Sequence, residues 1–137
     1  LLKGEGEWTT SKKENLKIIA GDFLKANVEK DIKEYFNQDN IYVIANLPYY
    51  ITTPILLKIL EEAPSIKKLT IMIQKEVADR VVAMPHSKDY GVLTINTNYV
   101  ADVKKIINVP NTSFIPAPNV TSAVIQIIPN EIILFFI

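Results

Sequence analysis

The chain has 137 residues, of which 48% are hydrophobic and 22% are charged, so one globular domain with a sizeable core is expected. Lys plus Arg number 15 and Asp plus Glu number 15, a balance that argues against a dedicated nucleic-acid binder with a basic excess. The absence of cysteine and the single histidine, His86, exclude disulfides, thiolate metal sites and histidine-rich metal sites. No apolar run is long enough to span a membrane and no signal peptide is visible, so a cytoplasmic location is expected.

The first half of the chain predicts strands and helices in alternation. Residues 1–17 are polar and remain unassigned. A short apolar run at residues 16–20 ends at Gly21 and Asp22, as a strand does at a turn. Residues 28–36 are weakly helical, and residues 41–45 form a continuous apolar run typical of a strand covered on both faces.

A helix is predicted after residue 52. Thr53 is suited to cap its N-terminus, with Pro54 at the first helical position, and Pro64 closes it. Four apolar residues then fall on one helical face: Ile55, Leu56, Ile59 and Leu60.

The second half of the chain continues the alternation and ends in two strands. Residues 69–73 predict a buried strand, and residues 75–83 a helix that Pro85 stops and in which Glu76 pairs with Arg80. Residues 90–99 predict a further helix. Residues 100–109 and 122–128 predict strands joined by a proline-rich loop, so the pattern indicates an α/β domain with a mostly parallel sheet.

The tetrad Asn46-Leu47-Pro48-Tyr49 follows the strand that ends at Ala45. Ligands of open α/β sheets bind beyond the carboxyl ends of strands, so the tetrad lies where chemistry is expected. The Asn46 side-chain oxygen and a backbone carbonyl near Leu47 or Pro48 can accept hydrogen bonds from an adenine amine and so free its delocalised lone pair. Tyr49 offers an aromatic face for the base. A plain turn, with Asn46 capping the strand and Tyr49 packed inward, stays open as the alternative.

Four ordered segments resemble one known family. The tetrad resembles the signature of amino-group methyltransferases that act on nucleic acid, and its Leu47 is similar to that of the ribosomal RNA adenine dimethylase family. Residues 73–80 (IQKEVADR), 87–91 (SKDYG) and 114–124 (FIPAPNVTSAV) are similar to later segments of that family, in order. The resemblance covers residues 18 to 129 and implies a Rossmann-like class I methyltransferase sheet.

The resemblance implies roles for particular residues. Asp22 matches the acidic residue that accepts a hydrogen bond from the adenine amine of the cofactor, although a turn-capping aspartate is an equally ordinary interpretation. Asn46 and Tyr49 match the residues at the target amine and base, with Asn46 also beside the cofactor. Phe114 matches an aromatic residue that holds the base from the other side. Lys75 and Arg80 suit a solvated helix face better than an RNA contact, and His86 has no expected role.

The implied activity is methylation of adenine exocyclic amines in small-subunit ribosomal RNA, giving dimethyladenosine, with S-adenosylmethionine as methyl donor. The implied partner is the small ribosomal subunit, and no metal is required. Methyl transfer would proceed by direct displacement, which depends on positioning more than on a strong general base. The target base must leave its stack to reach the site.

Parts of the family pattern have no counterpart in the sequence. There is no glycine-rich cofactor loop after an apolar strand, and the first two strands and the helical C-terminal domain are not recognised. We therefore expect residues 18–129 to be the carboxyl-side part of a catalytic domain, flanked by unassigned segments at 1–17 and 130–137. Such a partial chain is expected to bind S-adenosylmethionine poorly.

Two other functions remain open from the sequence. One is a large-subunit ribosomal RNA methylase of the antibiotic-resistance type, which usually differs at the second tetrad position. The other is a non-catalytic assembly or RNA-binding factor of the same fold, against which the intact tetrad argues. An α/β domain of unrelated use is disfavoured by four matched segments.

Overall fold

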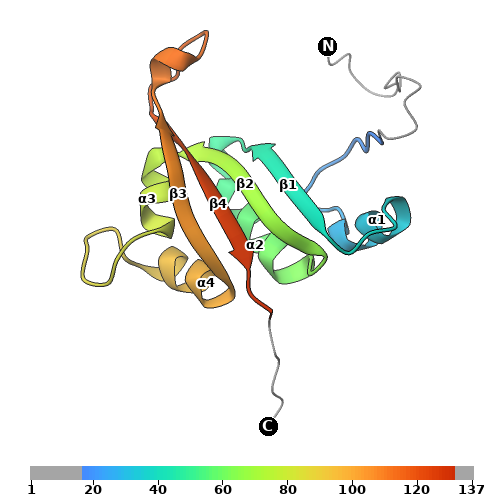
Figure 1. The fold of residues 1–137 in the computed structure, drawn as a ribbon. Coiled ribbons are helices and arrows are strands. Elements are labelled where there is room, and N and C mark those ends of the chain that lie inside the picture. The colour runs from blue at the N-terminus through green and yellow to red at the C-terminus, as the bar shows by residue number, and fades with distance from the viewer. Residues whose placement is uncertain (1–16, 132–137) are drawn as a thin grey trace.

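The computed structural model describes residues 17–131. In chain order the elements are α1 (Val28–Tyr35), β1 (Ile41–Asn46), η1 (Tyr49–Ile51), α2 (Thr52–Glu62), β2 (Ile66–Gln74), α3 (Lys75–Val81), α4 (Val92–Val100), β3 (Ala101–Val109), η2 (Asn111–Ser113) and β4 (Ser122–Pro129). The four strands form one sheet, and α2, α3 and α4 lie together on one of its faces (Figure 1). No helix within residues 17–131 has the length and apolar character that crossing a membrane requires.

The sheet is mixed, with the strand order β1-β2-β4-β3. β1 and β2 are parallel, whereas β4 runs antiparallel to both of its neighbours, β2 and β3. β1, β2 and β3 therefore share one direction and only β4 is reversed. The prediction of a mostly parallel sheet is wrong for the pairing of the strands. The reversed strand β4 lies between β2 and β3, so two of the three strand pairs are antiparallel.

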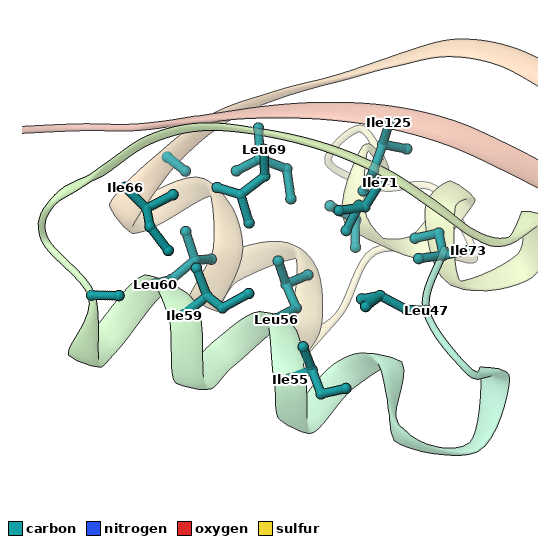
Figure 2. Packing of buried hydrophobic residues seen from close by; sticks show 14 of the residues in the cluster. Leu47, Ile55, Leu56, Ile59, Leu60, Ile66, Leu69, Ile71, Ile73 and Ile125 are labelled. Atoms are coloured by element: carbon teal, nitrogen blue, oxygen red, sulfur yellow. The ribbon is translucent and has the colours of Figure 1, made fainter. Parts of the chain in front are cut away.

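The core lies between the sheet and α2. From Leu69 onward every second residue of β2 is buried, and these side chains meet the apolar face of α2 (Figure 2). Each fully buried Leu or Ile stabilises the fold by roughly 1.5–3 kcal/mol relative to an exposed one. The largest leucine and isoleucine side chains that are fully buried in this cluster include Leu56, Leu69, Ile71, Ile73, Ile125 and Ile127.

Most predicted elements are confirmed by the structure. The helices expected near residues 28, 75 and 90 are α1, α3 and α4, and the two final strands are β3 and β4. The helix after residue 52 buries its four predicted apolar residues, but its predicted start is wrong. The helix begins at Thr52, one residue before the predicted cap Thr53, and no side chain caps its N-terminus. The Thr52 hydroxyl donates to the Pro48 carbonyl. Pro54 still lies in the first turn, where the missing N–H leaves no bond unmade.

Two strand predictions need correction. Residues 17–20 form no strand, and Ile18 and Ile19 are exposed, because no strand within the described residues pairs with them. β1 is an edge strand whose residues alternate between half-buried and exposed, so it is not covered on both faces. Its inward residues face α2, and the side chain of Ile44 on the other face is 88% exposed. Of the unassigned segments expected at 1–17 and 130–137, residues 1–16 and 132–137 lie outside the described residues.

Asp79 joins α3 to β3. Its carboxylate accepts hydrogen bonds from the ammonium groups of Lys105, at 2.7 Å, and Lys75, at 2.5 Å. The hydrogen bond from Lys105 has the largest effect and that from Lys75 the second largest, and both hold the pKa of Asp79 below its ordinary value. Because the folded-state pKa is lowered, the ionised carboxylate stabilises the fold above the unfolded-state pKa, and this contribution is lost as the pH falls through the folded-state pKa.

We therefore expect Asp79→Asn to lower the free energy of unfolding at neutral pH. The difference from the parent should shrink as the pH falls below the unfolded-state pKa and through the lowered folded-state pKa of Asp79. Urea unfolding at several pH values measures this. Asp102→Asn, an exposed site on β3, is the matched control and should leave the stability almost unchanged. A pH-independent loss in Asp79→Asn would contradict the ion-pair account.

Candidate active site

The tetrad turns away from the sheet at the carboxyl end of β1. Asn46 is the last residue of this strand and is exposed. The parallel ladder continues for one more bond, from the Leu47 N–H to the Met72 carbonyl at 3.1 Å. The Leu47 side chain is buried in the core (Figure 2). Leu47 therefore anchors the turn, and a role for it in chemistry rests on its backbone alone.

Hydrogen bonds distinguish the two backbone carbonyls of the tetrad. The Pro48 carbonyl accepts the Ile51 N–H at 3.2 Å and the Thr52 hydroxyl at 3.0 Å, so both of its lone pairs are in use. The Leu47 carbonyl accepts no hydrogen bond from any of residues 17–131. Of the two candidates left open by the sequence, the Leu47 carbonyl is the one free to bind a substrate donor.

Tyr49 begins η1, and its hydroxyl lies 2.6 Å from that of Ser122. Ser122 is the first residue of β4 and is fully buried. The alternative interpretation was a plain turn in which Tyr49 packs inward and Asn46 caps the strand. The inward Tyr49 hydroxyl agrees with this turn, but the Asn46 side chain makes no capping hydrogen bond within the described residues.

The loop between β3 and β4 extends beyond the sheet at the end where β1 and β2 finish (Figure 1). It contains η2, Phe114 and a cis peptide bond between Ile115 and Pro116. The Asn111 side chain donates to the Pro118 carbonyl at 3.1 Å and ties the two arms of the loop together. At its end, the Lys75 N–H donates to the Thr121 carbonyl at 2.9 Å. The loop is therefore braced at its base.

The tetrad and this loop line an open cavity of about 450 Å³. A volume of this size suits a small-molecule or base-sized ligand. Its lining carries no charged side chain, so it suits a neutral aromatic group better than a phosphate. It is lined by Asn46, Leu47, Pro48, Tyr49, Phe114, Ile115, Pro116 and Pro118.

The structure brings the tetrad and Phe114 together, as the sequence predicted for the site. Pro116 and Pro118 of the loop also line the cavity. Ser122 was missed as a site residue. It lies in a segment that resembles the family, but no sequence pattern indicates that its hydroxyl meets Tyr49.

Asp22 lies apart from this cavity. One carboxylate oxygen accepts the Leu24 N–H at 3.0 Å, and the Lys25 ammonium lies 3.8 Å from the other. The geometry matches a turn-capping aspartate. Asp22 also borders a separate hollow of about 260 Å³, whose walls are largely apolar and include Phe23 and Phe36. That hollow, with a carboxylate at its border, has the chemistry to accept a flat ring that bears an amine.

The predicted ion pair of α3 is confirmed. Arg80 and Glu76 form an exposed ion pair at 2.6 Å. Lys75 is bonded to Asp79, and His86 lies in an exposed loop with a positive φ of 69°. In residues 17–131 no three His, Cys, Asp or Glu side chains are grouped as a metal site.

Comparison with known proteins gives the family. The family model described as ribosomal RNA adenine dimethylase matches residues 6–133. A ribosomal RNA small subunit methyltransferase A from Anoxybacillus flavithermus is 48% identical over 124 residues, which are 90% of this chain and 42% of the relative. The corresponding protein from Alkaliphilus oremlandii is 52% identical over 113 residues, or 82% of this chain and 39% of the relative. The chain spans about two fifths of the length of these curated relatives.

Solved structures agree with the fold. A dimethyladenosine transferase from Plasmodium falciparum matches with a TM-score of 0.63 and 37% identity, over 65% of this chain and 32% of that one. The 23S rRNA methyltransferase ErmE matches with a TM-score of 0.63 and 26% identity, over 85% of this chain and 43% of that one. The described residues thus form part of a class I methyltransferase sheet. The chain belongs to the ribosomal RNA adenine dimethylase family.

Proposed function

We propose that this protein transfers methyl groups to adenine amines of small-subunit ribosomal RNA, with residues 18–129 forming part of its catalytic domain. The observation that carries the proposal is the uncharged cavity in which the tetrad faces Phe114. Relatives named as small-subunit methyltransferases are about half identical to the chain, which favours the small subunit over the large one.

The cavity supports recognition of an exocyclic amine. The Asn46 side-chain oxygen and the Leu47 carbonyl are acceptors, and neither is occupied by another group of residues 17–131. Two hydrogen bonds accepted from the amine withdraw its lone pair from conjugation with the ring, so that the nitrogen becomes nucleophilic. The geometry is held by the Leu47 anchor in the core and by the Thr52–Pro48 bond.

Tyr49 and Phe114 line the cavity from its two sides and supply aromatic faces for the flipped base. Stacking on an aromatic side chain is worth roughly 1–3 kcal/mol per base. A lining without charged side chains also favours entry of a base over a phosphate. These residues bind and orient the base, and none of them acts as a strong general base.

S-adenosylmethionine supplies the methyl group when it is bound. Asp22 is the described residue expected to bind this cofactor. One of its carboxylate oxygens caps the turn, and the ammonium of the exposed Lys25 lies 3.8 Å from the other. The second oxygen is available to accept a hydrogen bond from the adenine amine of the cofactor, and the apolar hollow beside it suits the ring. The residues therefore fit one end of the cofactor.

The central experiment measures methyl transfer from labelled S-adenosylmethionine to under-methylated small ribosomal subunits by the full-length protein. Removing one amine acceptor, in Asn46→Ala, should reduce the rate by about a hundredfold or more. Asn96→Ala, at an exposed position of α4, is the matched control and should keep the parent rate. Label should appear as methylated adenine in the small-subunit RNA.

Other outcomes point to other functions. Transfer only to large subunits would move the assignment to the large-subunit enzymes, as in the structural neighbour ErmE. A folded, cofactor-binding parent that transfers no methyl group to either subunit would contradict the enzyme proposal. It would favour a non-catalytic assembly factor.

The cofactor assignment predicts a separate effect on binding. Asp22→Asn should weaken S-adenosylmethionine binding by the full-length protein by roughly tenfold or more, because a bond to a charged acceptor is lost. Isothermal titration calorimetry measures this. Asp31→Asn, which changes the other carboxylate of the same hollow, is the control and should bind like the parent. Equal losses in both variants would indicate general electrostatics instead of a hydrogen bond from Asp22.

A further inference from the structure

The hydroxyl pair of Tyr49 and Ser122 links two parts of the chain that are 73 residues apart. Ser122 has no exposed surface, and Tyr49 is its hydroxyl partner within the described residues. A buried hydroxyl without a partner is costly, so the position of the Ser122 side chain and that of the Tyr49 ring depend on each other. The bond is short, at 2.6 Å, which is close to the optimum for two hydroxyl groups.

Tyr49 lines the cavity, and Ser122, which does not line it, directly follows the loop that carries Phe114. Tyr49 follows β1, whereas Ser122 ends the loop that carries Phe114 and begins β4. Ser122 is itself fixed, because β4 pairs on both sides there, with Gln74 of β2 and Val109 of β3. The bond therefore ties the Tyr49 ring to the paired start of β4, at the foot of the loop that carries Phe114.

The bond also restricts what the Tyr49 hydroxyl can do. The phenol oxygen is engaged with a buried serine while Tyr49 lines the cavity, so the hydroxyl is held in place and the ring is the part of Tyr49 that can stack on a bound base. Two torsion angles set the ring plane, and holding the hydroxyl restricts both.

We propose that Ser122 is a positioning residue for the target base. It holds the Tyr49 ring in the plane needed for stacking and sets the gap between Tyr49 and Phe114 in which the base is held. The proposal rests on the proposed function of this cavity. Ser122 acts through Tyr49 and does not itself touch the base.

The test is a double-mutant cycle in the full-length protein with Ser122→Ala, Tyr49→Phe and the double variant. Each single change should lower kcat/KM for small-subunit methylation by about tenfold, and the double variant should be no worse than either. A residue that acts only through the tyrosine hydroxyl has nothing further to contribute once that hydroxyl is gone. Ser113→Ala, an exposed serine in the same loop, is the control and should match the parent.

A second readout does not depend on catalysis. RNA that carries 2-aminopurine at the target position should be quenched strongly when its flipped base stacks on Tyr49 in the parent. Quenching should weaken in both single variants, while their affinity for S-adenosylmethionine and their thermal unfolding midpoints stay within the range of the control. Losses that add in the double variant, or parent-like quenching in Ser122→Ala, would overturn the proposal. If the parent quenches the probe but transfers no methyl group, the proposed function fails and the quenching data alone decide the role of Ser122.

Discussion

The reversed strand β4 is the constraint on which the site depends. It pairs with β2 on one side and β3 on the other, so its first residue is fixed at the end of the sheet where β1 and β2 finish. The connection from β3 must therefore return over that same end, and it carries Phe114 to the tetrad. If β4 ran parallel to its neighbours, its first residue would lie at the far end of the sheet and the cavity would lose one wall. The antiparallel pairing that departs from the expected sheet is thus what assembles the site.

The elements that the sequence predicted correctly are those whose signal is local. The apolar face of α2 follows from the spacing of Ile55, Leu56, Ile59 and Leu60, and the buried run of β2 from its hydrophobic continuity. The errors came where pairing decides. A short apolar run such as residues 17–20 is a strand only if a neighbour is present to pair with it, and an edge strand such as β1 contains as many apolar residues as a covered one. Neither property is encoded in the run itself.

The candidate site divides in the same way. The tetrad and Phe114 could be predicted from sequence because each belongs to a segment with its own composition and a family resemblance. That they share a cavity follows from topology, which the local patterns left undetermined. The preference for the Leu47 carbonyl over that of Pro48 required the hydrogen bonds from Ile51 and Thr52. The contact of Ser122 with the site could not be predicted from sequence, because its partner Tyr49 lies 73 residues away.

On the proposed function, the hydrogen-bonding groups of the tetrad influence which base the cavity would accept. With the Pro48 carbonyl occupied, the acceptors of the tetrad that no group of residues 17–131 occupies include the Asn46 side-chain oxygen and the Leu47 carbonyl. A backbone carbonyl is an acceptor only, so it rewards an amine and repels the ring carbonyl that guanine or uracil presents at the corresponding position. A site that leaves a buried acceptor unpaired with the wrong ligand discriminates more strongly than one built from apolar contacts alone. On the proposed function, the acceptors that the turn leaves free would favour an amine-bearing base, and the aromatic residues would add affinity without adding to that choice.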